Sequence, residues 1–534
     1  MPHDQTQDEI QNQDRDQAQN QIQAQNQAQA QNRDQIQDRD QAQIEIQIQA
    51  YDPRTGDPTG PPIPSTPPAD VDQAVAAAQT AFPAWRTTDR AAALDAIASA
   101  LDEHAAELVA LADQETALGV TRLTGEVART TGQLRLFSSV LRENKYQDTL
   151  IEHAEAAAAK PDLRRVNRPL GPVAVFAASN FPFAFSVAGG DTASALAAGC
   201  PVIVKAHEAH PHTSRRTAEL VNQALKNAGA PEGTFNLVFG FEAGVHLVKH
   251  PGITAVGFTG STRGGLALAK LCADRPTPIP FYGELGSVNP VFVLPGAAAD
   301  RATEIATGYA GSLTQGSGQF CTNPGIMFVP DGAELLDAIA NAVSNTVGAP
   351  MLAERIHDGL VAGQEHLSTI PGVRLVAEGK PGEGPWAPTP AVYAVSAEDF
   401  QTNAATLREE HFGPVGLLVT YTPDTETAPA HLLKQGSVGT GHLTSTIHLS
   451  PQNAADVAAA QELLPHLERI AGRIVFNGWP TGVAVTHAQH HGGPYPATTA
   501  PAHTSVGAAA IRRWFVPVVY QDAPPELLPE SLQD

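Results

Sequence analysis

The spacing of apolar and polar residues changes about fifty residues into the chain. Residues 1–50 contain 18 glutamines, all at odd positions, and few large apolar side chains. Such a segment cannot bury enough surface to offset its chain entropy, so residues 1–46 are predicted to form a disordered, glutamine-rich tail. At its end, isoleucine occupies every second position from Ile44 to Ile48. This alternation predicts a half-buried strand over residues 43–48.

Three alanine-rich segments then carry apolar residues three and four positions apart, which is the spacing of amphipathic helices. They span residues 70–81, 89–112 and 121–141. The first two open on an aspartate, Asp70 and Asp89. Both helices are predicted to begin there, because an aspartate side chain accepts from the free amides of a first helical turn.

Short apolar runs alternate with helical patterns through the middle of the chain. The runs predict strands over residues 173–176, 202–204, 237–239, 254–258, 290–294, 326–329 and 415–421, with helices around 302–313 and 333–347. The alternation is typical of βαβ units on parallel sheets. It predicts an α/β protein with two doubly wound domains. A lone strand predicted over residues 513–520 needs the edge of a sheet in its own chain or in a partner.

Composition and charge narrow the class of protein. Lysine and arginine number 33 against 56 aspartates and glutamates, and the net charge of −23 argues against a nucleic acid held by its phosphates. No segment approaches the roughly 20 uninterrupted apolar residues of a bilayer-spanning helix, so no membrane partner is expected. The three cysteines are too few and too widely spaced for a disulfide framework or a zinc site. Together with a polar, acidic N-terminus, they predict a cytoplasmic protein.

Cys321 is the candidate nucleophile. It lies in a glycine-containing loop, residues 315–325, between a helical pattern and a predicted strand. Glycines let backbone amides approach a thiol, which can lower its pKa and let it attack a carbonyl carbon. A buried structural cysteine fits the local sequence equally well. For Cys200 and Cys272, which lie at a predicted strand and in a predicted helix, the structural role is favoured.

Glu284 and Asn180 are candidates for two further roles in such chemistry. Glu284 lies between apolar residues and glycines, where a carboxylate resists ionisation and can act as a general base near neutral pH. A solvated loop glutamate is the alternative, and the local sequence alone favours it. Asn180 follows a predicted strand, and its amide can donate to a developing oxyanion. Asparagine in that position more often caps a turn.

Several candidate nucleotide contacts follow predicted strands. Gly240 and Gly244 lie in one strand-to-helix turn, and Gly260 and Ser261 lie in another. Such turns present free amides and a helix dipole to a phosphate, although they use glycine for turning as well. Lys205 ends a predicted strand, from where a lysine can reach ribose or phosphate. Protection of the strand end explains Lys205 equally well.

Two histidine-rich loops raise the question of a metal. They are residues 207–212 and 487–491. A proline interrupts the first loop, and neither loop combines a helical histidine pair with a third ligand. We therefore expect ordinary loop histidines and no metal.

Taken in order, the motifs resemble those of the aldehyde dehydrogenase superfamily from about Tyr51 to Gln521. They are Asn180-Phe181-Pro182, Lys205, Phe258-Thr259-Gly260-Ser261, Glu284-Leu285-Gly286, Gly318-Gln319-Phe320-Cys321 and Glu410-His411-Phe412-Gly413-Pro414. A narrower resemblance is to the branch of this family that oxidises α-ketoglutaric semialdehyde (2,5-dioxovalerate). It is carried by residues 188–199, 477–483 and 491–496.

The resemblance implies NAD(P)-dependent oxidation of a small-molecule aldehyde to its acid, here 2,5-dioxovalerate to 2-oxoglutarate. Cys321 would form a thiohemiacetal and then a thioester. Asn180 and the backbone amide of Cys321 would hold the oxyanion, and Glu284 would activate the water that hydrolyses the thioester.

The resemblance also implies a domain organisation. Residues 47–281 would form the NAD(P)-binding domain and residues 282–464 the catalytic domain, after which residues 465–534 return to the cofactor domain. The hairpin 150–168 and the terminal strand would form a small β element for oligomerisation, as a homodimer or homotetramer.

Cofactor contacts follow from the same resemblance. Lys205 and Glu410 would bind ribose hydroxyls and Ser261 the pyrophosphate, with Phe412 as a further cofactor contact. Glu208, three residues after Lys205, would face the adenine ribose. A carboxylate there accepts from the 2′-hydroxyl and repels a 2′-phosphate, which predicts NAD, with NADP as the alternative.

A cation is expected near the substrate tunnel because the substrate carries a carboxylate. Arg129 and Gln133 lie one turn apart on a predicted helix that resembles the tunnel wall of the family. We predict that both contact the substrate and that Arg129 binds its carboxylate. An ordinary surface arginine is the alternative.

Two other functions fit the same sequence. One is a succinate or glutarate semialdehyde dehydrogenase. The other is a catalytically silent protein that uses the fold and the glutamine-rich tail for assembly. The joint presence of Cys321, Glu284 and Asn180 weighs against a silent protein.

Overall fold

The computed structural model describes residues 47–534, apart from the side chains of Lys145 and Ala333. The tail predicted over residues 1–46, and with it most of the strand predicted over 43–48, lies outside the described residues. The first described strand, β1 (Gln47–Tyr51), pairs with β2 (Pro58–Pro64).

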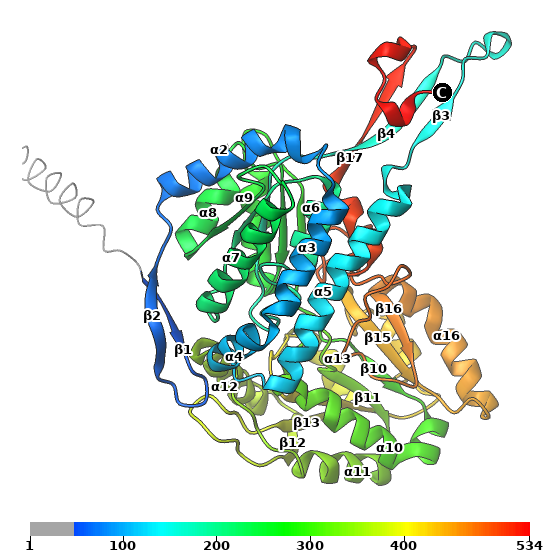
Figure 1. The fold of residues 1–534 in the computed structure, drawn as a ribbon. Coiled ribbons are helices and arrows are strands. Elements are labelled where there is room, and N and C mark those ends of the chain that lie inside the picture. The colour runs from blue at the N-terminus through cyan, green and yellow to red at the C-terminus, as the bar shows by residue number, and fades with distance from the viewer. Residues whose placement is uncertain (1–46) are drawn as a thin grey trace, which may run out of the picture. The chain divides into compact units, whose positions relative to one another are not determined.

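A five-stranded parallel sheet forms the first half of the fold (Figure 1). Its order is β7 (Phe235–Val238), β6 (Val202–Lys205), β5 (Val173–Phe176), β8 (Ala255–Thr259) and β9 (Phe281–Glu284). The crossover helices are α6 (Gly190–Ala198), α7 (Pro211–Asn227), α8 (Phe241–Lys249) and α9 (Thr262–Ala273). All neighbouring strands of this sheet run parallel, as the alternation of apolar runs and helical patterns predicts.

Both faces of this sheet are covered, because its strands are apolar at odd and even positions alike. Val173 and Val175 pack in one core with α6, α7 and the helices α3 (Arg90–Glu103) and α5 (Val120–Glu143). Ala174 and Phe176 pack in another with α8, α9 and α2 (Pro68–Trp85). Successive side chains of a strand point to opposite faces, so continuous apolar runs require two covering layers.

The second half is a seven-stranded sheet covered in the same way. Its order is β12 (Arg374–Glu378), β13 (Ala391–Ser396), β14 (Val415–Tyr421), β11 (Ile326–Pro330), β10 (Val291–Val293), β15 (His442–His448) and β16 (Ala471–Phe476), with only β12 antiparallel. One face packs on α10 (Pro295–Thr314) and α11 (Ala333–Ser344). The other packs on α12 (Glu354–Thr369), α13 (Ala397–Thr402), α14 (Ala404–Leu407), α15 (Pro429–Lys434) and α16 (Ala454–Ile470).

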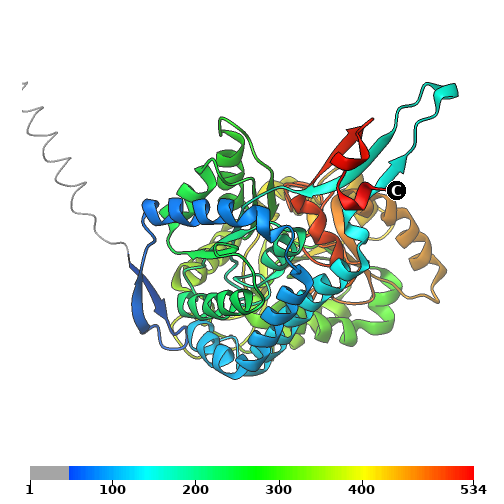
Figure 2. The same ribbon diagram turned by 45° about the horizontal axis from the view of Figure 1, so that its top comes forward.

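A third, antiparallel sheet contains β17 (Phe515–Gln521), β4 (Leu163–Pro169) and β3 (Leu150–Glu152). Figures 1 and 2 show it projecting away from the five-stranded sheet. The start of β17 is fixed on α6, where Arg513 forms a 2.7 Å ion pair with Asp191 and the Trp514 indole donates to Ser194. The hairpin and the terminal strand predicted from the sequence therefore pair within one chain.

The N-terminal helices confirm one predicted cap and correct another. Asp89 accepts from the amide of Ala92 and precedes α3, as expected. Asp70 is not a cap: α2 starts at Pro68, because a proline at the first helical position lacks the amide that would need a partner. The single helix predicted over 89–112 is two helices, α3 and α4 (Ala105–Thr116), which meet at the non-helical His104.

The strands missed by the pattern differ in character: β2 is proline-rich and β15 is mostly polar, whereas β13 is apolar and buried. All seven residues of β15 are buried although five of them are histidine, threonine or serine. Only some of their polar groups find partners: the side chain of Asn289 accepts from the backbone amide and the hydroxyl of Thr444. The hydroxyl of Thr446 and both ring nitrogens of His448 have no hydrogen-bond partner among the described residues. The strand predicted over 237–239 begins two residues earlier, at Phe235.

The ends of the two sheets along the chain differ from the predicted domain limits at residues 281 and 464. Strand β9 pairs with β8, which extends the five-stranded sheet to Glu284. Strand β16 pairs with β15, so the seven-stranded sheet runs to Phe476. The assignment of domains stays a prediction.

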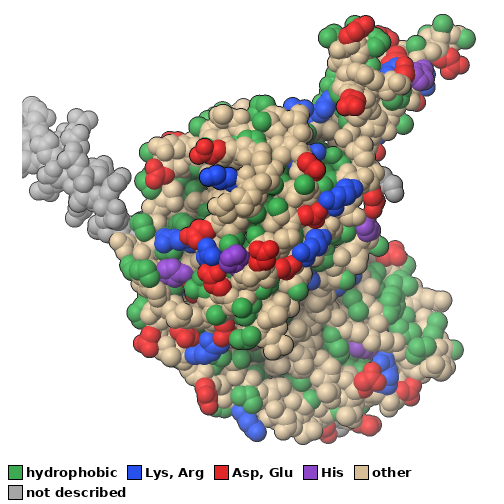
Figure 3. Space-filling model, viewed as in Figure 1, with side chains coloured by type: hydrophobic (Ala, Val, Ile, Leu, Met, Phe, Trp, Pro, Cys, Tyr) green, Lys and Arg blue, Asp and Glu red, His purple; other side chains and the backbone are tan. Residues whose placement is uncertain are grey.

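No helix within residues 47–534 is both long and apolar enough to cross a bilayer. On the face shown in Figure 3, lysine and arginine side chains are interspersed with aspartate and glutamate side chains. This face carries no basic patch.

Candidate active site

Cys321 lies in a loop that its neighbours hold rigidly before β11. A Cβ on Gly318 would lie 2.2 Å from the backbone carbon of Gly413, so the close approach requires glycine. The side-chain amide of Asn323 donates to the carbonyls of Gly318 and Gly413, at 2.8 and 2.9 Å. That of Asn289 donates to the carbonyl of Cys321 at 2.9 Å. As a whole residue Cys321 is intermediate in exposure, whereas Cys200 and Cys272 are buried, as their predicted structural role requires.

Asn180 lies beside this loop, although the two are far apart in sequence. Its side-chain amide donates to the carbonyl of Gln319 at 2.9 Å. Its own carbonyl accepts from Arg122 at 2.6 Å, and the guanidinium of Arg122 stacks on Phe181 and Phe320. The bond to Gln319, which is 139 residues away in sequence, does not support the alternative that Asn180 caps a local turn. Asn180 reaches the nucleophile loop, where its remaining N–H can serve an oxyanion.

Glu284 ends β9 and is buried, so it is not a solvated loop residue. One carboxylate oxygen lies 2.8 Å from Nε2 of His491, and the other accepts from the hydroxyl of Ser505. The predicted rise in pKa is wrong. Burial alone would raise the pKa of Glu284, but His491 and Ser505 stabilise the carboxylate, and the net shift is downward.

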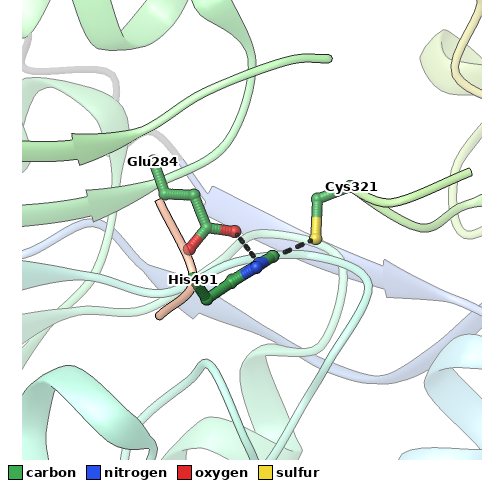
Figure 4. A group of neighbouring side chains, drawn as sticks. All are labelled: Glu284, Cys321 and His491. Atoms are coloured by element: carbon green, nitrogen blue, oxygen red, sulfur yellow. Dashed lines mark hydrogen bonds and ion pairs between the residues drawn. The ribbon is translucent and has the colours of Figure 1, made fainter. Parts of the chain in front are cut away.

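His491 is one of the residues of the site that the sequence analysis missed. In Figure 4 it points toward both Glu284 and Cys321, and its Nε2 lies 3.5 Å from Sγ of Cys321. Its backbone is fixed by Thr504, whose hydroxyl accepts from the His491 amide at 2.8 Å, and by Ser505, whose amide donates to its carbonyl at 2.9 Å. The sequence signal that could have identified His491 is its position at the start of the 491–496 motif.

The environment of Cys321 raises the pKa of its thiol well above the ordinary value. Burial is the main cause, followed by the nearby carboxylates of Glu284 and Glu410, and Arg473 acts in the opposite direction. The lowering expected from loop amides is therefore not found. Burial and the two carboxylates together disfavour the thiolate.

The three donor atoms of Glu284, Cys321 and His491 lie within 4.8 Å of one another. Each of these groups already has a hydrogen-bond or ion-pair partner within the cluster. Absence of a metal stays a prediction. Of the other histidine loop, His210 is buried and its ring contacts the carbonyl of Ala178 and the hydroxyl of Ser214.

The predicted nucleotide contacts gather at one edge of the five-stranded sheet. Phe176 lies in register with both Lys205 and Phe258, and Lys205 with Val238. The turns after β6, β7 and β8 therefore lie at the same edge of the sheet, with β5 between β6 and β8. Gly240 precedes α8 with a φ of +100°, and Ser261 caps α9 by accepting from the amide of Gly264. The carboxyl edge of a parallel sheet is where dinucleotides bind.

The side chains at this edge suit a dinucleotide. Lys205 forms an ion pair with Glu208, which remains 38% exposed. Gly244 packs on Phe176 and on the side chain of Lys205, and a Cβ on Gly260 would lie 2.8 Å from the ring of Phe258. An ammonium group, a carboxylate and two helix N-termini are the donors and acceptors that ribose and pyrophosphate need.

Glu410 and Phe412 line a cavity with Phe320 and Asn323, directly behind the Cys321 loop. A Cβ on Gly286 would lie 2.2 Å from a carboxylate oxygen of Glu410. Desolvation within this cavity raises the pKa of Glu410 to about 7, although the residue as a whole is exposed. Glu410 thus lies close to Gly286 and to Cys321.

Of the two predicted substrate contacts, only Arg129 lies near the nucleophile. It is half-buried, donates to the carbonyl of Val483 and stacks on Phe185. Cys321 and Glu284 are close enough to oppose the lowering of its pKa that burial causes. Gln133 is buried and packs against Gly190 at the start of α6.

Arg473, on β16, is a second cation that the sequence analysis missed. Burial lowers its pKa and the nearby Cys321 opposes that change. It donates to the carbonyls of Pro480 and Gly482, next to the carbonyl that Arg129 binds. Two arginines from distant segments therefore hold one loop, residues 480–483, beside the nucleophile. The Nε of each is buried and has no hydrogen-bond partner among the described residues.

The fold and this cluster define a known class of enzyme. The model of the aldehyde dehydrogenase family matches residues 39–431, and the chain belongs to this family. The predicted α/β fold, the family and the aldehyde-oxidising, nicotinamide-dependent class are thus confirmed. A catalytically silent protein is not favoured.

Two curated relatives match most of the chain. It is 45% identical to alpha-ketoglutaric semialdehyde dehydrogenase 2 of Azospirillum brasilense, over 91% of this chain and 93% of that protein. It is 40% identical to alpha-ketoglutaric semialdehyde dehydrogenase of Acinetobacter baylyi, over 87% and 89%.

Solved structures share the fold. Aldehyde dehydrogenase C from Pseudomonas syringae, in complex with NAD+ and octanal, superposes with a TM-score of 0.74 at 24% identity, over 90% of this chain and 95% of that one. A 1-pyrroline-5-carboxylate dehydrogenase gives a TM-score of 0.75 at 22% identity, over 90% of each chain.

Proposed function

We propose that this enzyme oxidises α-ketoglutaric semialdehyde to 2-oxoglutarate with NAD+. The observation that carries the proposal is the pair of arginines, Arg129 and Arg473, beside the nucleophile Cys321. A semialdehyde that ends in a carboxylate needs such a cation near the reacting carbon. The identity of 45% to a relative of that name supports the same substrate.

In the proposed reaction, the sulfur of Cys321 adds to the aldehyde carbon and gives a thiohemiacetal. Asn180 and the amide of Cys321 hold the resulting oxyanion. A bound nicotinamide supplies the hydride acceptor. Glu284 then takes a proton from water, which attacks the thioester, releases the acid and returns the sulfur as thiolate.

Nucleotide binding is assigned to the edge of the five-stranded sheet. We assign the ribose contacts to Lys205 and Glu410 and the adenine-ribose contact to Glu208, which favours NAD over NADP. The remaining contacts are Gly240, Gly244, Gly260, Ser261 and Phe412. Gly240, Gly260 and Ser261 lie in turns after strands, Gly244 lies in the first turn of α8, and Phe412 lies in the cavity behind the Cys321 loop.

Assembly is proposed to use the antiparallel sheet. Strand β17 is one of its edges and carries the exposed side chains of Val516, Val518 and Val519. An apolar edge strand is a template for a second copy. We assign it to a homodimer or homotetramer in the cytoplasm.

The substrate assignment is tested by Arg129→Gln against the matched control Arg135→Gln. Arg135 lies on the same helix, but its side chain is 47% exposed and pairs with Asp102. We expect Arg129→Gln to lower kcat/KM for α-ketoglutaric semialdehyde about tenfold or more and to change that for pentanal little, because only the first carries a carboxylate. The control should change neither. An equal loss on both aldehydes would contradict the assignment.

The same assay separates the alternatives by chain length. Succinic and glutaric semialdehydes are compared with α-ketoglutaric semialdehyde on the unmodified enzyme. The proposal requires the highest kcat/KM for the keto acid. A higher value for either of the others would reassign the substrate.

A further inference from the structure

Asn180 lies in a loop between β5 and α6 that belongs to no helix or strand. The backbone amide of Ala178 donates to the carbonyl of Phe185 at 2.9 Å and closes this loop, residues 178–185. An oxyanion donor must be held in place before the reaction, because a misplacement of about 1 Å can lower the rate about a hundredfold. The groups that hold the loop can therefore affect the reaction through Asn180.

Two side chains of α5 hold this loop. Nη2 of Arg122 donates to the carbonyl of Asn180 at 2.6 Å. Glu126, which is 4% exposed, accepts through Oε1 from the backbone amides of Phe183 and Ala184, at 2.8 and 3.0 Å. Residues four apart in a helix lie on the same face, so one face of α5 binds the loop at both of these points.

Arg122 also contacts the nucleophile loop. Its guanidinium carbon lies 5.1 Å from the ring centre of Phe181 and 4.9 Å from that of Phe320, the residue before the nucleophile. A Cβ on Gly316, in the same loop, would lie 2.3 Å from Nη1 of Arg122. A planar guanidinium can stack on rings and donate to a carbonyl at the same time, and lysine cannot do both. Arg122 therefore connects the loop of the oxyanion donor to that of the nucleophile.

The contact of Glu126 with the loop does not depend on its charge. Burial raises the pKa of Glu126, and the guanidinium of Arg122 opposes this rise. A carboxyl oxygen accepts hydrogen bonds in the ionised and in the neutral acid. The amide oxygen of a glutamine at position 126 would accept from the same two backbone amides, which makes a conservative variant available.

We propose that Arg122 and Glu126 are positioning residues for the oxyanion site, which hold the loop 178–185 so that the free N–H of Asn180 stays beside the nucleophile loop. Neither side chain needs to contact the reacting atoms, and both act through Asn180. The inference rests on the oxyanion role proposed for Asn180. A purely structural role would stabilise the fold and leave the reaction of the folded enzyme unchanged.

The test is a double-mutant cycle between Glu126→Leu and Asn180→Ala. The rate of NADH formation is measured in a single turnover, with enzyme in excess over the aldehyde and NAD+ saturating. Glu126→Leu alone should lower this rate about tenfold to a hundredfold, because two loop amides lose their acceptor. In the Asn180→Ala enzyme the same change should lower it less than about twofold, because the group through which Glu126 acts is absent. An equal loss in both backgrounds, or no loss in either, would overturn the proposal.

Two further variants separate positioning from stability. Glu126→Gln keeps the acceptor and should recover most of the rate that Glu126→Leu loses. A rate as low as that of Glu126→Leu would contradict the assigned contact. Glu115→Leu is the matched control, because Glu115 is 1% exposed and also accepts from two backbone amides, those of His212 and Thr213. It should lower Tm as Glu126→Leu does but leave the single-turnover rate within about twofold. An equal loss of rate would assign the effect to general loosening of the fold.

Arg122→Lys replaces Glu126→Leu in the cycle if the latter does not fold. It keeps the charge and loses the stacked, forked contact, so the rate should fall only where Asn180 is present. The aldehyde in all measurements is whichever of α-ketoglutaric semialdehyde and pentanal the unmodified enzyme oxidises faster, so the result does not depend on the substrate assignment. An unchanged rate in Asn180→Ala would remove the oxyanion role and this proposal together. An additive cycle would remove this proposal alone.

Discussion

The cofactor edge and the catalytic cluster of this enzyme are assembled differently. At the cofactor edge, Lys205 ends β6, and Gly240 and Ser261 follow β7 and β8 of the same sheet. The cluster instead takes Glu284 from the end of β9, Cys321 from the loop before β11 and His491 from a loop far along the chain. The first region is built from repeats of one local motif. The second exists only after distant segments pack together.

The chemistry of the cofactor edge and that of the catalytic cluster therefore depend on different kinds of contacts. The phosphate-binding turns depend on strand ends, helix N-termini and glycine, which are local properties. The charge on Cys321 depends on partners that no local pattern specifies. The two regions should therefore fail separately when single residues are changed, and the following predictions test that separation.

Cys321→Ser should have the largest effect. A hydroxyl in place of the thiolate should lower kcat about a thousandfold or more, because nucleophilic attack is lost. The Kd for NAD+, measured by quenching of protein fluorescence, should stay within about twofold if cofactor binding is independent. Parallel loss of NAD+ binding would show that the two regions are coupled.

The difference between local motifs and contacts of distant segments also explains which features could be predicted from the sequence. Doubly wound sheets follow from apolar runs such as Val173–Phe176, whose continuous hydrophobicity requires two covering layers. Cys321, Glu284 and Asn180 were identified because each lies in a distinctive motif. Strand β15 was missed because its threonines and histidines are polar although they are buried, and only Thr444 is satisfied by Asn289.

The direction of both catalytic pKa shifts could not be predicted. Glu284 was expected to resist ionisation because its sequence neighbours are apolar. Its actual neighbours are His491 and Ser505, more than 200 residues away in sequence. Arg473 was missed for the same reason, because nothing in the sequence of β16 indicates that it approaches Cys321.

Lys205→Ala should have an intermediate effect, confined to the cofactor edge. Loss of the ammonium group that ends β6 should raise KM for NAD+ about tenfold and change kcat for the semialdehyde little. Alkylation of Cys321 by iodoacetamide should keep its pH profile. Lys226→Ala, at an exposed position near the end of α7, is the control and should change nothing. A changed pH profile of Cys321 alkylation in Lys205→Ala would show that the cofactor edge and the catalytic cluster are coupled.

Glu208→Gln should have the smallest effect, on the choice between nicotinamides. A carboxylate repels the 2′-phosphate of NADP, so its removal should raise kcat/KM for NADP relative to NAD. Because Glu208 is 38% exposed and already paired with Lys205, solvent and the ion pair screen its charge. We therefore expect a change of about threefold to tenfold rather than a full reversal.

The matched control for this prediction is Glu219→Gln, on α7, whose side chain is 55% exposed and pairs with Arg216. It removes the same charge from the same half of the protein but not from the strand end. An equal gain with NADP in both variants would assign discrimination to the overall negative charge. A gain confined to Glu208→Gln would show that the carboxylate of Glu208, after β6, itself discriminates between NAD and NADP. This result is expected if the cofactor edge depends on local motifs.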